Sequence, residues 1–159
     1  MRKILLTALA ALIAALNLYG VDYDDYDNGE SVEPYFAYYD QSGTMLMQAT
    51  FRVLADTTGG PALDRYPTFR KKNAGAFAEW VFVRYERSRW GTTGIFAVTF
   101  DIGADGKLRN VQVQKKLDEK ATADLVRIVS RSPKWGAALS NGKPVAMGYY
   151  LEMVFYGRD

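Results

Sequence analysis

The sequence predicts an α+β domain in which two helices pack on one face of a three-stranded antiparallel sheet. Two observations predict this class. Three segments alternate apolar and polar residues, as half-buried strands do, and two other segments carry apolar residues at helical spacing. In chain order these segments read helix, strand, strand, helix, strand.

The clearest element is a β-hairpin at residues 91–113. Its first strand carries four apolar residues at every second position, Phe96, Val98, Phe100 and Ile102. The dipeptide Asp105-Gly106 tolerates positive φ and favours a tight turn. Beyond this turn the alternation resumes with Arg109, Val111 and Val113 on one face. The second strand therefore has a narrower apolar face than the first.

A helix at residues 74–86 precedes the hairpin, and one at residues 118–131 follows it. The first has an apolar face formed by Phe77, Trp80, Val81 and Tyr85. In the second, Asp118 is a suitable N-cap and Pro133 ends the helix. Its buried stripe comprises Ala121, Leu125, Ile128 and Val129. Trp80 and Trp135 are interpreted as core residues, with Trp135 closing over the sheet after the helix ends.

A long strand closes the domain after a turn at residues 142–144. Alternate residues of this strand are apolar and are expected to face the core: Val145, Met147, Tyr149, Leu151, Met153 and Phe155. Glu152 lies on the opposite face, so we expect it to point toward solvent.

The N-terminus indicates export. Arg2 and Lys3 precede an apolar run at residues 4–16, a pattern typical of a secretory signal peptide at residues 1–20. As a helix this run would span roughly 20 Å, which is short of the ~30 Å hydrocarbon core of a bilayer. An uncleaved membrane anchor remains the alternative. The absence of cysteine excludes a lipid-anchored lipoprotein.

Residues 21–61 form an acidic, tyrosine-rich extension. Residues 21–40 contain seven acidic and no basic side chains, whereas residues 41–159 contain 18 basic and 11 acidic ones, a net charge of +7. Residues 35–39 and 44–54 are interpreted as two strands around a turn. The loop at residues 56–61 separates this extension from the main domain, residues 67–159.

The composition excludes several classes of chemistry. The chain has no cysteine and no histidine, so thiol nucleophiles, Ser-His catalysis and the usual zinc sites are absent. The acidic run at residues 22–27 lacks the spacing of a calcium loop, and no metal is expected. The scattered positive charge does not indicate nucleic-acid binding.

The carboxylates that could pair for acid–base chemistry are Asp101, Asp105, Asp118 and Glu119. A turn accounts for Asp105 and a helix cap accounts for Asp118. The sequence therefore predicts a protein that is not an enzyme and has no cofactor.

Several short motifs occur in one order along residues 67–155. They are Pro67-Thr68-Phe69, Phe77-x-x-Trp80-Val81, Gly91-x-x-Gly94, Phe100-x-Ile102-x-x-Asp105-Gly106, Leu117-Asp118, Pro133-Lys134-Trp135 and Asn141-Gly142-Lys143-Pro144-Val145. In this order they resemble the TonB C-terminal domain family, in its stand-alone Bacteroidetes-type form. The chain departs from that family at Glu86, at Ala137-Ala138 and near Glu152, where the family commonly has proline or glycine.

The resemblance implies a periplasmic module that docks an extended peptide of an envelope or outer-membrane transport partner by strand addition. An open edge of the last strand would receive the guest. The candidate site residues are Met147, Gly148, Tyr149, Tyr150, Leu151, Glu152 and Met153.

Two alternatives stay open. One is an energy transducer for outer-membrane transport, anchored in the inner membrane by an uncleaved N-terminus. Only in that case would the protein contact a membrane. The other is an envelope structural or interaction protein whose sheet edge is covered by its own N-terminal segment or by a second copy in a homodimer.

Overall fold

The computed structural model describes residues 35–54, 63–86 and 92–157. The expected signal peptide, most of the acidic segment and the loop at residues 56–61 lie outside these ranges. Within the described ranges, no helix combines the length and the apolar character needed to cross a membrane.

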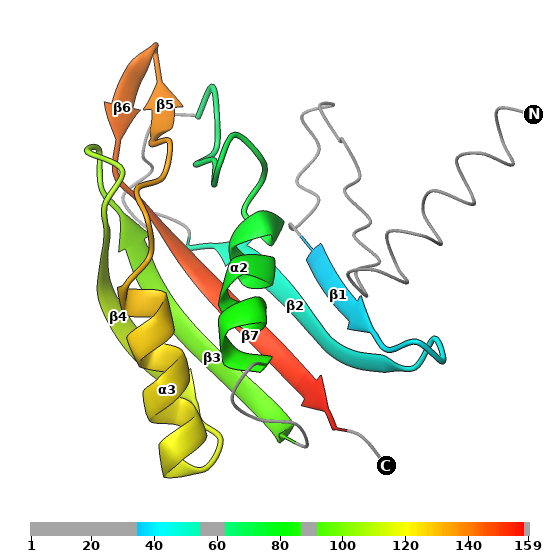
Figure 1. Cartoon of the computed structure of the whole chain (residues 1–159). Helices are drawn as coiled ribbons and strands as arrows, with labels where there is room; N and C mark the ends of the chain where they lie inside the picture. The colour runs from blue at the N-terminus through cyan, green and yellow to red at the C-terminus, as the bar shows by residue number, and fades with distance from the viewer. Residues whose placement is uncertain (1–34, 55–62, 87–91, 158–159) are drawn as a thin grey trace, which may run out of the picture.

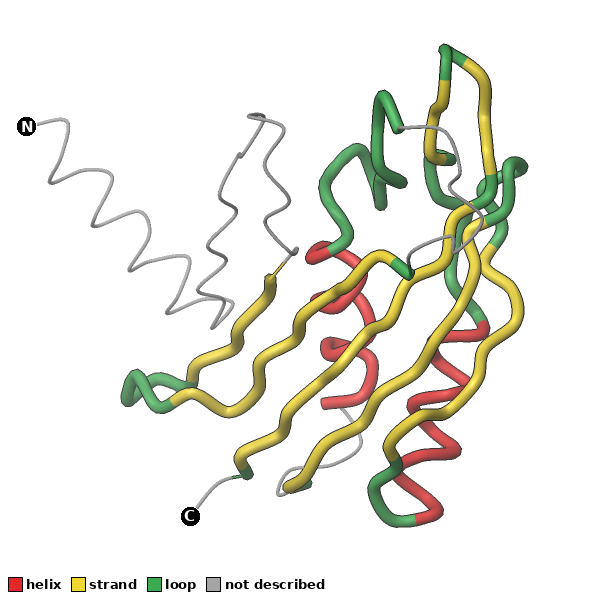
Figure 2. The backbone as a smooth tube through the Cα atoms, turned by 180° about the vertical axis from the view of Figure 1, so that it is seen from behind, coloured by secondary structure: helices red, strands yellow, loops and turns green. Residues whose placement is uncertain are grey.

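A five-stranded antiparallel sheet forms the body of the domain, in the order β1-β2-β7-β3-β4. Both helices lie on one face of this sheet (Figure 1). Seen from behind, the strands lie in front of both helices (Figure 2). The elements in chain order are β1 (Tyr35–Tyr39), β2 (Met45–Val53), α2 (Gly75–Glu86), β3 (Thr93–Ile102), β4 (Leu108–Lys115), α3 (Glu119–Ser130), β5 (Ala138–Ser140), β6 (Lys143–Val145) and β7 (Met147–Tyr156).

The expected α-β-β-α-β unit is present as α2-β3-β4-α3-β7, with the short β5–β6 ribbon inserted before β7. The expected number of strands is wrong. The expected strands at residues 35–39 and 44–54 form the β1–β2 hairpin, and β2 adds to the sheet beside β7. Since the hairpin shares the sheet, it is not set apart from the main domain as an extension. If the sheet had only the three strands β7, β3 and β4, the apolar side chains of the β1–β2 hairpin would have no surface on which to pack.

The patterns of the first strand of the central hairpin and of α3 are confirmed, whereas the alternation expected along the second strand is wrong. Arg109 and Val113 are exposed and Val111 is half-buried, because two register shifts interrupt the β3–β4 ladder. Phe96, Val98, Phe100 and Ile102 are all buried, at 1% exposure or less. The Asp118 side chain caps α3 by accepting a hydrogen bond from the Ala121 N–H at 2.9 Å. The buried residues of α3 are the four expected ones, Ala121, Leu125, Ile128 and Val129.

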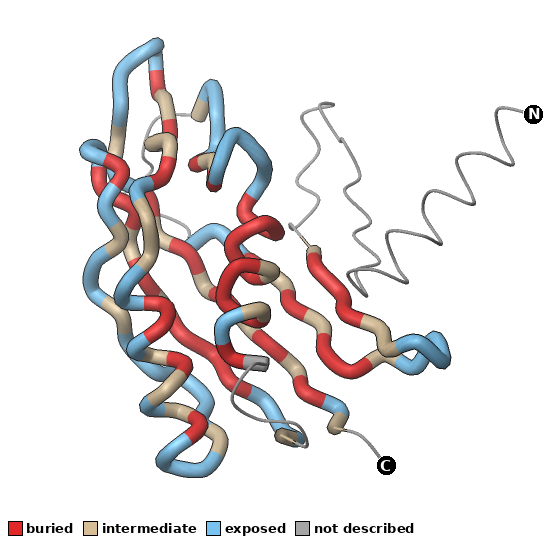
Figure 3. Tube along the Cα trace, viewed as in Figure 1, coloured by how far each residue is buried: buried red, intermediate tan, exposed pale blue. Residues whose placement is uncertain are grey.

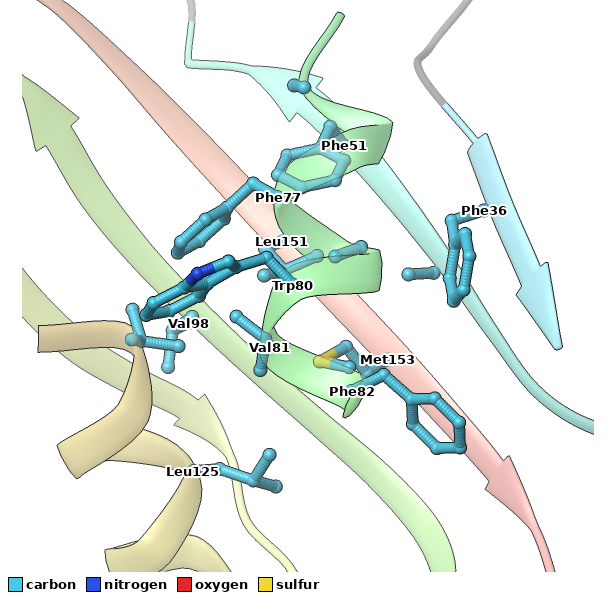
Figure 4. Packing of buried hydrophobic residues seen from close by; sticks show 14 of the residues in the cluster. Phe36, Phe51, Phe77, Trp80, Val81, Phe82, Val98, Leu125, Leu151 and Met153 are labelled. Atoms are coloured by element: carbon cyan, nitrogen blue, oxygen red, sulfur yellow. The ribbon is translucent and has the colours of Figure 1, made fainter. Parts of the chain in front are cut away.

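Helix α2 is buried on more than one side (Figure 3). Phe77 and Trp80 point away from the β1–β2 hairpin, whereas Phe82 points toward it (Figure 4). The Phe82 ring lies 6.5 Å from the Phe36 ring and 4.6 Å from the Tyr38 ring, both on β1. The helical spacing of apolar residues in the sequence predicted burial only for the face that carries Phe77 and Trp80.

Trp135 closes over the sheet, as expected. Its ring contacts Phe77 at 5.0 Å, Phe100 at 6.2 Å and Tyr149 at 6.1 Å between centroids. The indole N–H donates to the Ser132 hydroxyl at 2.9 Å, so its polar atom is satisfied inside the core. This cluster joins α2 to β3 and β7.

Candidate functional site

The last strand, β7, is paired along both of its edges. On one side it pairs with β3, from Ile102↔Met147 to Thr93↔Tyr156. On the other side it pairs with β2, from Val53↔Tyr149 to Met47↔Phe155. The Leu54 N–H extends this second ladder by donating to the Gly148 carbonyl at 2.9 Å. A guest strand could form backbone hydrogen bonds with β7 only after β2 had left the sheet.

The candidate site residues therefore do not line an open edge. Their alternation is as expected: Met147, Tyr149, Leu151 and Met153 are buried against the core, and Gly148, Tyr150 and Glu152 lie half-buried on the outer face. The premise of an open edge is wrong, because β2 occupies the position of a guest strand. Of the alternatives drawn from the sequence, the edge covered by the chain's own N-terminal segment is the one observed.

Strand β2 is held in place by core packing as well as by backbone pairing. Met47, Ala49 and Phe51 have no exposed surface. The Phe51 ring meets the edge of the Tyr149 ring at 5.6 Å, and Leu151 of β7 lies close by in the same core (Figure 4). These β2 residues are not among the site residues expected from the sequence.

A polar network crosses the outer face of the sheet and ties β2, β7 and β4 together. The Lys115 ammonium of β4 donates to Glu152 Oε2 at 2.8 Å. The two strands are not neighbours: Ala97 of β3 pairs with both residues, and its small side chain lets the lysine reach across it. The Tyr150 hydroxyl also donates to Glu152, at 3.0 Å, and the Arg52 guanidinium lies 4.7 Å from the centre of the Tyr150 ring.

These contacts set the charge of the network. The hydrogen bond from Lys115 holds the pKa of Glu152 below its ordinary value of 4.5, with a smaller contribution from Tyr150. The same bond raises the pKa of Lys115 above 10.5. Glu152 lies on the outer face of the sheet, as expected, and there it accepts the ion pair from Lys115.

Replacing Glu152 by glutamine should change how stability depends on pH. Because the folded pKa of Glu152 is lowered, its contribution to stability is present above pH 4.5 and is lost as the pH falls through the folded value. The contribution of Lys115 is present below pH 10.5 and is lost as the pH rises through its raised value. Glu152→Gln should therefore lower the melting temperature near neutral pH by about 1–3 °C and reduce its fall between about pH 5 and pH 3. Parallel melting curves over that range would contradict the assignment.

The edge strand β4 is poorly suited to strand addition. Its ladder with β3 shifts register twice, between Ala97 and Val98 and between Thr99 and Asp101. Asn110, within the second irregularity, has a φ of 56°. Bulges of this kind twist an edge strand and interrupt the regular row of backbone groups that a guest needs.

Three of the four carboxylates considered for catalysis have structural partners, and the fourth, Glu119, is exposed in the first turn of α3. Asp101 accepts from Asn110 Nδ2 at 2.7 Å, and Asp118 caps α3. Asp105 forms a two-pronged ion pair with Arg109, and this pairing lowers its pKa to about 2. Among the residues that the structure describes, no group of acidic side chains is arranged to hold a metal ion.

The fold and the paired edge define a class of protein, an α+β domain with an antiparallel sheet and no assembled catalytic group among its described residues. Residues 86–156 match the family described as Gram-negative bacterial TonB protein C-terminal. The family that residues 86–156 match is the one that the motifs indicated, and domains of this family mediate protein interactions in the cell envelope. Comparison with curated proteins and with solved structures gave no match.

The matched region runs from the last residue of α2 to the last residue of β7. It leaves out β1, β2 and nearly all of α2. The hairpin that closes the β7 edge thus lies outside the part of the chain that matches the family.

Proposed function

We propose that the protein is a periplasmic protein-interaction module whose sheet edge is covered by its own hairpin. The observation that carries this proposal is the position of β2, which pairs with β7 from Tyr149 to Phe155. A partner protein of the envelope then binds surfaces other than the β7 edge. Export by a cleaved signal peptide at residues 1–20 belongs to the same proposal, and the tagged chain is expected in the soluble periplasmic fraction of its host.

The free energy needed to open the edge supports this choice over strand addition. A guest could pair with residues 147–153 only after β1 and β2 had left, which would expose Phe36, Tyr38, Met47 and Phe51. Each large apolar side chain costs about 1.5–3 kcal/mol to expose, so the four together cost on the order of 6–12 kcal/mol. That range is comparable to the whole binding free energy of a complex with a roughly micromolar to nanomolar Kd.

A disulfide between β2 and β7 tests the proposal directly. Gln48 and Val154 are directly paired across the two strands and are both half-buried on the outer face. Directly opposed strand positions suit disulfide geometry. Because the chain has no cysteine, Gln48→Cys with Val154→Cys introduces the only thiols. Oxidation locks the hairpin in place, and reduction releases it.

The locked and released proteins are then used to capture partners from the envelope of the native host. We expect the same partner to be captured with equal affinity in both states, and by each single-cysteine variant. Capture that is lost on oxidation and regained on reduction would instead assign binding to the β7 edge at residues 147–153. Failure to capture any envelope protein in either state would contradict the interaction function itself.

A further inference from the structure

We propose that the acidic segment at residues 22–33 docks on a basic cleft beside α2, on the helix side of the fold. The segment lies outside the described residues, and the proposal concerns only where it binds. It rests on the shape and charge of the cleft, on a strained turn that carries two cations, and on where the segment joins the described fold. It does not depend on the proposed function.

The cleft has a volume of about 310 Å³ and runs along α2 from Ala76 to Arg84. Its wall is aromatic and its rim is mainly basic; the lining residues are Phe69, Arg70, Lys72, Ala76, Glu79, Trp80, Val83 and Arg84. Three of these side chains are cations and one is an anion. Such a cleft favours carboxylate groups, which accept charge-assisted hydrogen bonds from guanidinium and ammonium groups.

Arg84 is fixed in the wall of the cleft. Its guanidinium lies 3.9 Å from the centre of the Trp80 ring, and its Nη1 donates to the Trp80 carbonyl at 3.1 Å. An arginine held in this way is a preorganised cation, because little side-chain freedom is left to lose when an anion binds.

The turn at the rim of the cleft carries backbone strain. Phe69 and Lys72 exchange backbone hydrogen bonds of 2.9 and 3.0 Å, and between them Arg70 and Lys71 both have positive φ, 51° and 64°. Two successive left-handed residues of this kind are ordinarily Asn-Gly or similar pairs, because a side chain at Cβ makes the conformation costly. Here the turn instead carries two long cations, of which Arg70 lines the cleft.

The acidic segment joins the described fold next to the cleft. The carbonyl oxygen of Tyr35 lies only 2.9 Å from the position that a Cβ on Gly75 would take, at the start of α2. Residues 22–33 contain six acidic and no basic side chains. Fully extended, they reach roughly 40 Å, whereas the cleft covers about 12 Å of α2 between Ala76 and Arg84. The segment is long enough to cover the cleft.

The covalent connection selects this occupant over a free acidic peptide. A short tether gives an effective concentration in the millimolar range. Exposed ion pairs are individually weak, so an acidic peptide in solution would need a comparable concentration to compete. The chain's own segment is therefore the first occupant of the cleft, and an acidic partner would have to displace it.

The test uses the chain from Val21, labelled with ¹⁵N, and a neutralised variant in which Asp22, Asp24, Asp25 and Asp27 are changed to asparagine and Glu30 and Glu33 to glutamine. Neutralisation should shift the backbone amide signals of Lys72, Val83 and Arg84 and leave the β7 signals unchanged. Adding an unlabelled peptide of residues 21–34 to the neutralised chain should return the shifted signals toward their wild-type positions. The same peptide should bind the wild-type chain several-fold more weakly.

Arg70→Asn with Lys71→Gly provides the matched control. This change relieves the strained turn, so the melting temperature should rise, while it removes Arg70, one of the three cations that line the cleft, together with its neighbour Lys71. In the neutralised chain it should weaken binding of the peptide by about fivefold. A loss of binding in a more stable protein cannot be attributed to unfolding.

Two results would overturn the proposal. If neutralisation leaves the cleft signals unchanged, the segment does not occupy the cleft, even if the peptide binds the wild-type chain as an acidic partner would. If neutralisation shifts those signals but the peptide does not restore them, the carboxylates of residues 22–33 affect the cleft without binding in it. Neither result bears on capture of an envelope partner, so failure here is distinguishable from failure of the proposed function.

Discussion

Replacing Phe51 by alanine should lower the free energy of unfolding of the whole domain by about 3–5 kcal/mol. Phe51 has no exposed surface and packs on Tyr149 of β7, so its removal leaves a cavity in the shared core. The loss is expected in denaturant unfolding followed by tryptophan fluorescence, which reports on Trp80, Trp90 and Trp135, none of which lies in the hairpin.

Val53→Ala is the matched control for this change. Val53 lies on the same strand but is 42% exposed, so the change should cost less than about 1 kcal/mol. If the hairpin were an independent extension, Phe51→Ala would leave the tryptophan transition where it is. A transition that moves with Phe51→Ala and not with Val53→Ala shows that β1 and β2 fold together with the rest of the domain.

Replacing Glu152 by proline should destabilise the domain by about 3–5 kcal/mol, which corresponds to a melting temperature lower by about 10–20 °C. β7 is paired with Thr50 of β2 on one side of this residue and with Ala97 of β3 on the other. Whichever side the Glu152 N–H faces, proline removes a ladder hydrogen bond and leaves the opposing carbonyl without its donor.

Glu152→Ala separates this backbone effect from the loss of the side chain. Alanine removes the ion pair with Lys115 but keeps the N–H, so it should lower the melting temperature by only a few degrees. Similar melting of the proline and alanine variants would mean that β7 has a free edge at this position. That result would support the open-edge site for strand addition that was expected from the sequence.

The helices and the central hairpin were predictable because their signals are local. The Asp118 side chain caps α3 by accepting a hydrogen bond from the backbone N–H of Ala121, three residues further on. Phe96, Val98 and Phe100 face the core because successive side chains of a strand point to opposite faces. These features depend on residues a few positions apart, so the sequence contains all the information needed.

The apolar residues of α2 contained a signal for a sheet wider than three strands. Besides the expected stripe, α2 carries Ala78 and Phe82, and both are buried. A helix with apolar residues over more than one stripe needs a second surface on which to bury them. The β1–β2 hairpin supplies that surface through Phe36 and Tyr38. The breadth of the apolar face of α2 therefore indicated that three strands were too few.

Local patterns in the sequence predicted the main helices and strands, most of the residues that face the core, and the family that residues 86–156 match. They did not predict the β5–β6 ribbon, whose second strand overlaps the expected turn at residues 142–144, or the burial of Ala78 and Phe82 on α2. The sequence also placed Met147, Tyr149, Leu151 and Met153 on the inner face of β7 correctly. Only the tertiary structure decided which strand lies on the far side of β7. Ladder hydrogen bonds are made by backbone groups that are the same in nearly every residue, so the pattern of a strand does not name its neighbour. The neighbour is chosen by packing, and β2 takes the position because Met47, Ala49 and Phe51 complete a core that α2 and β7 would otherwise leave exposed.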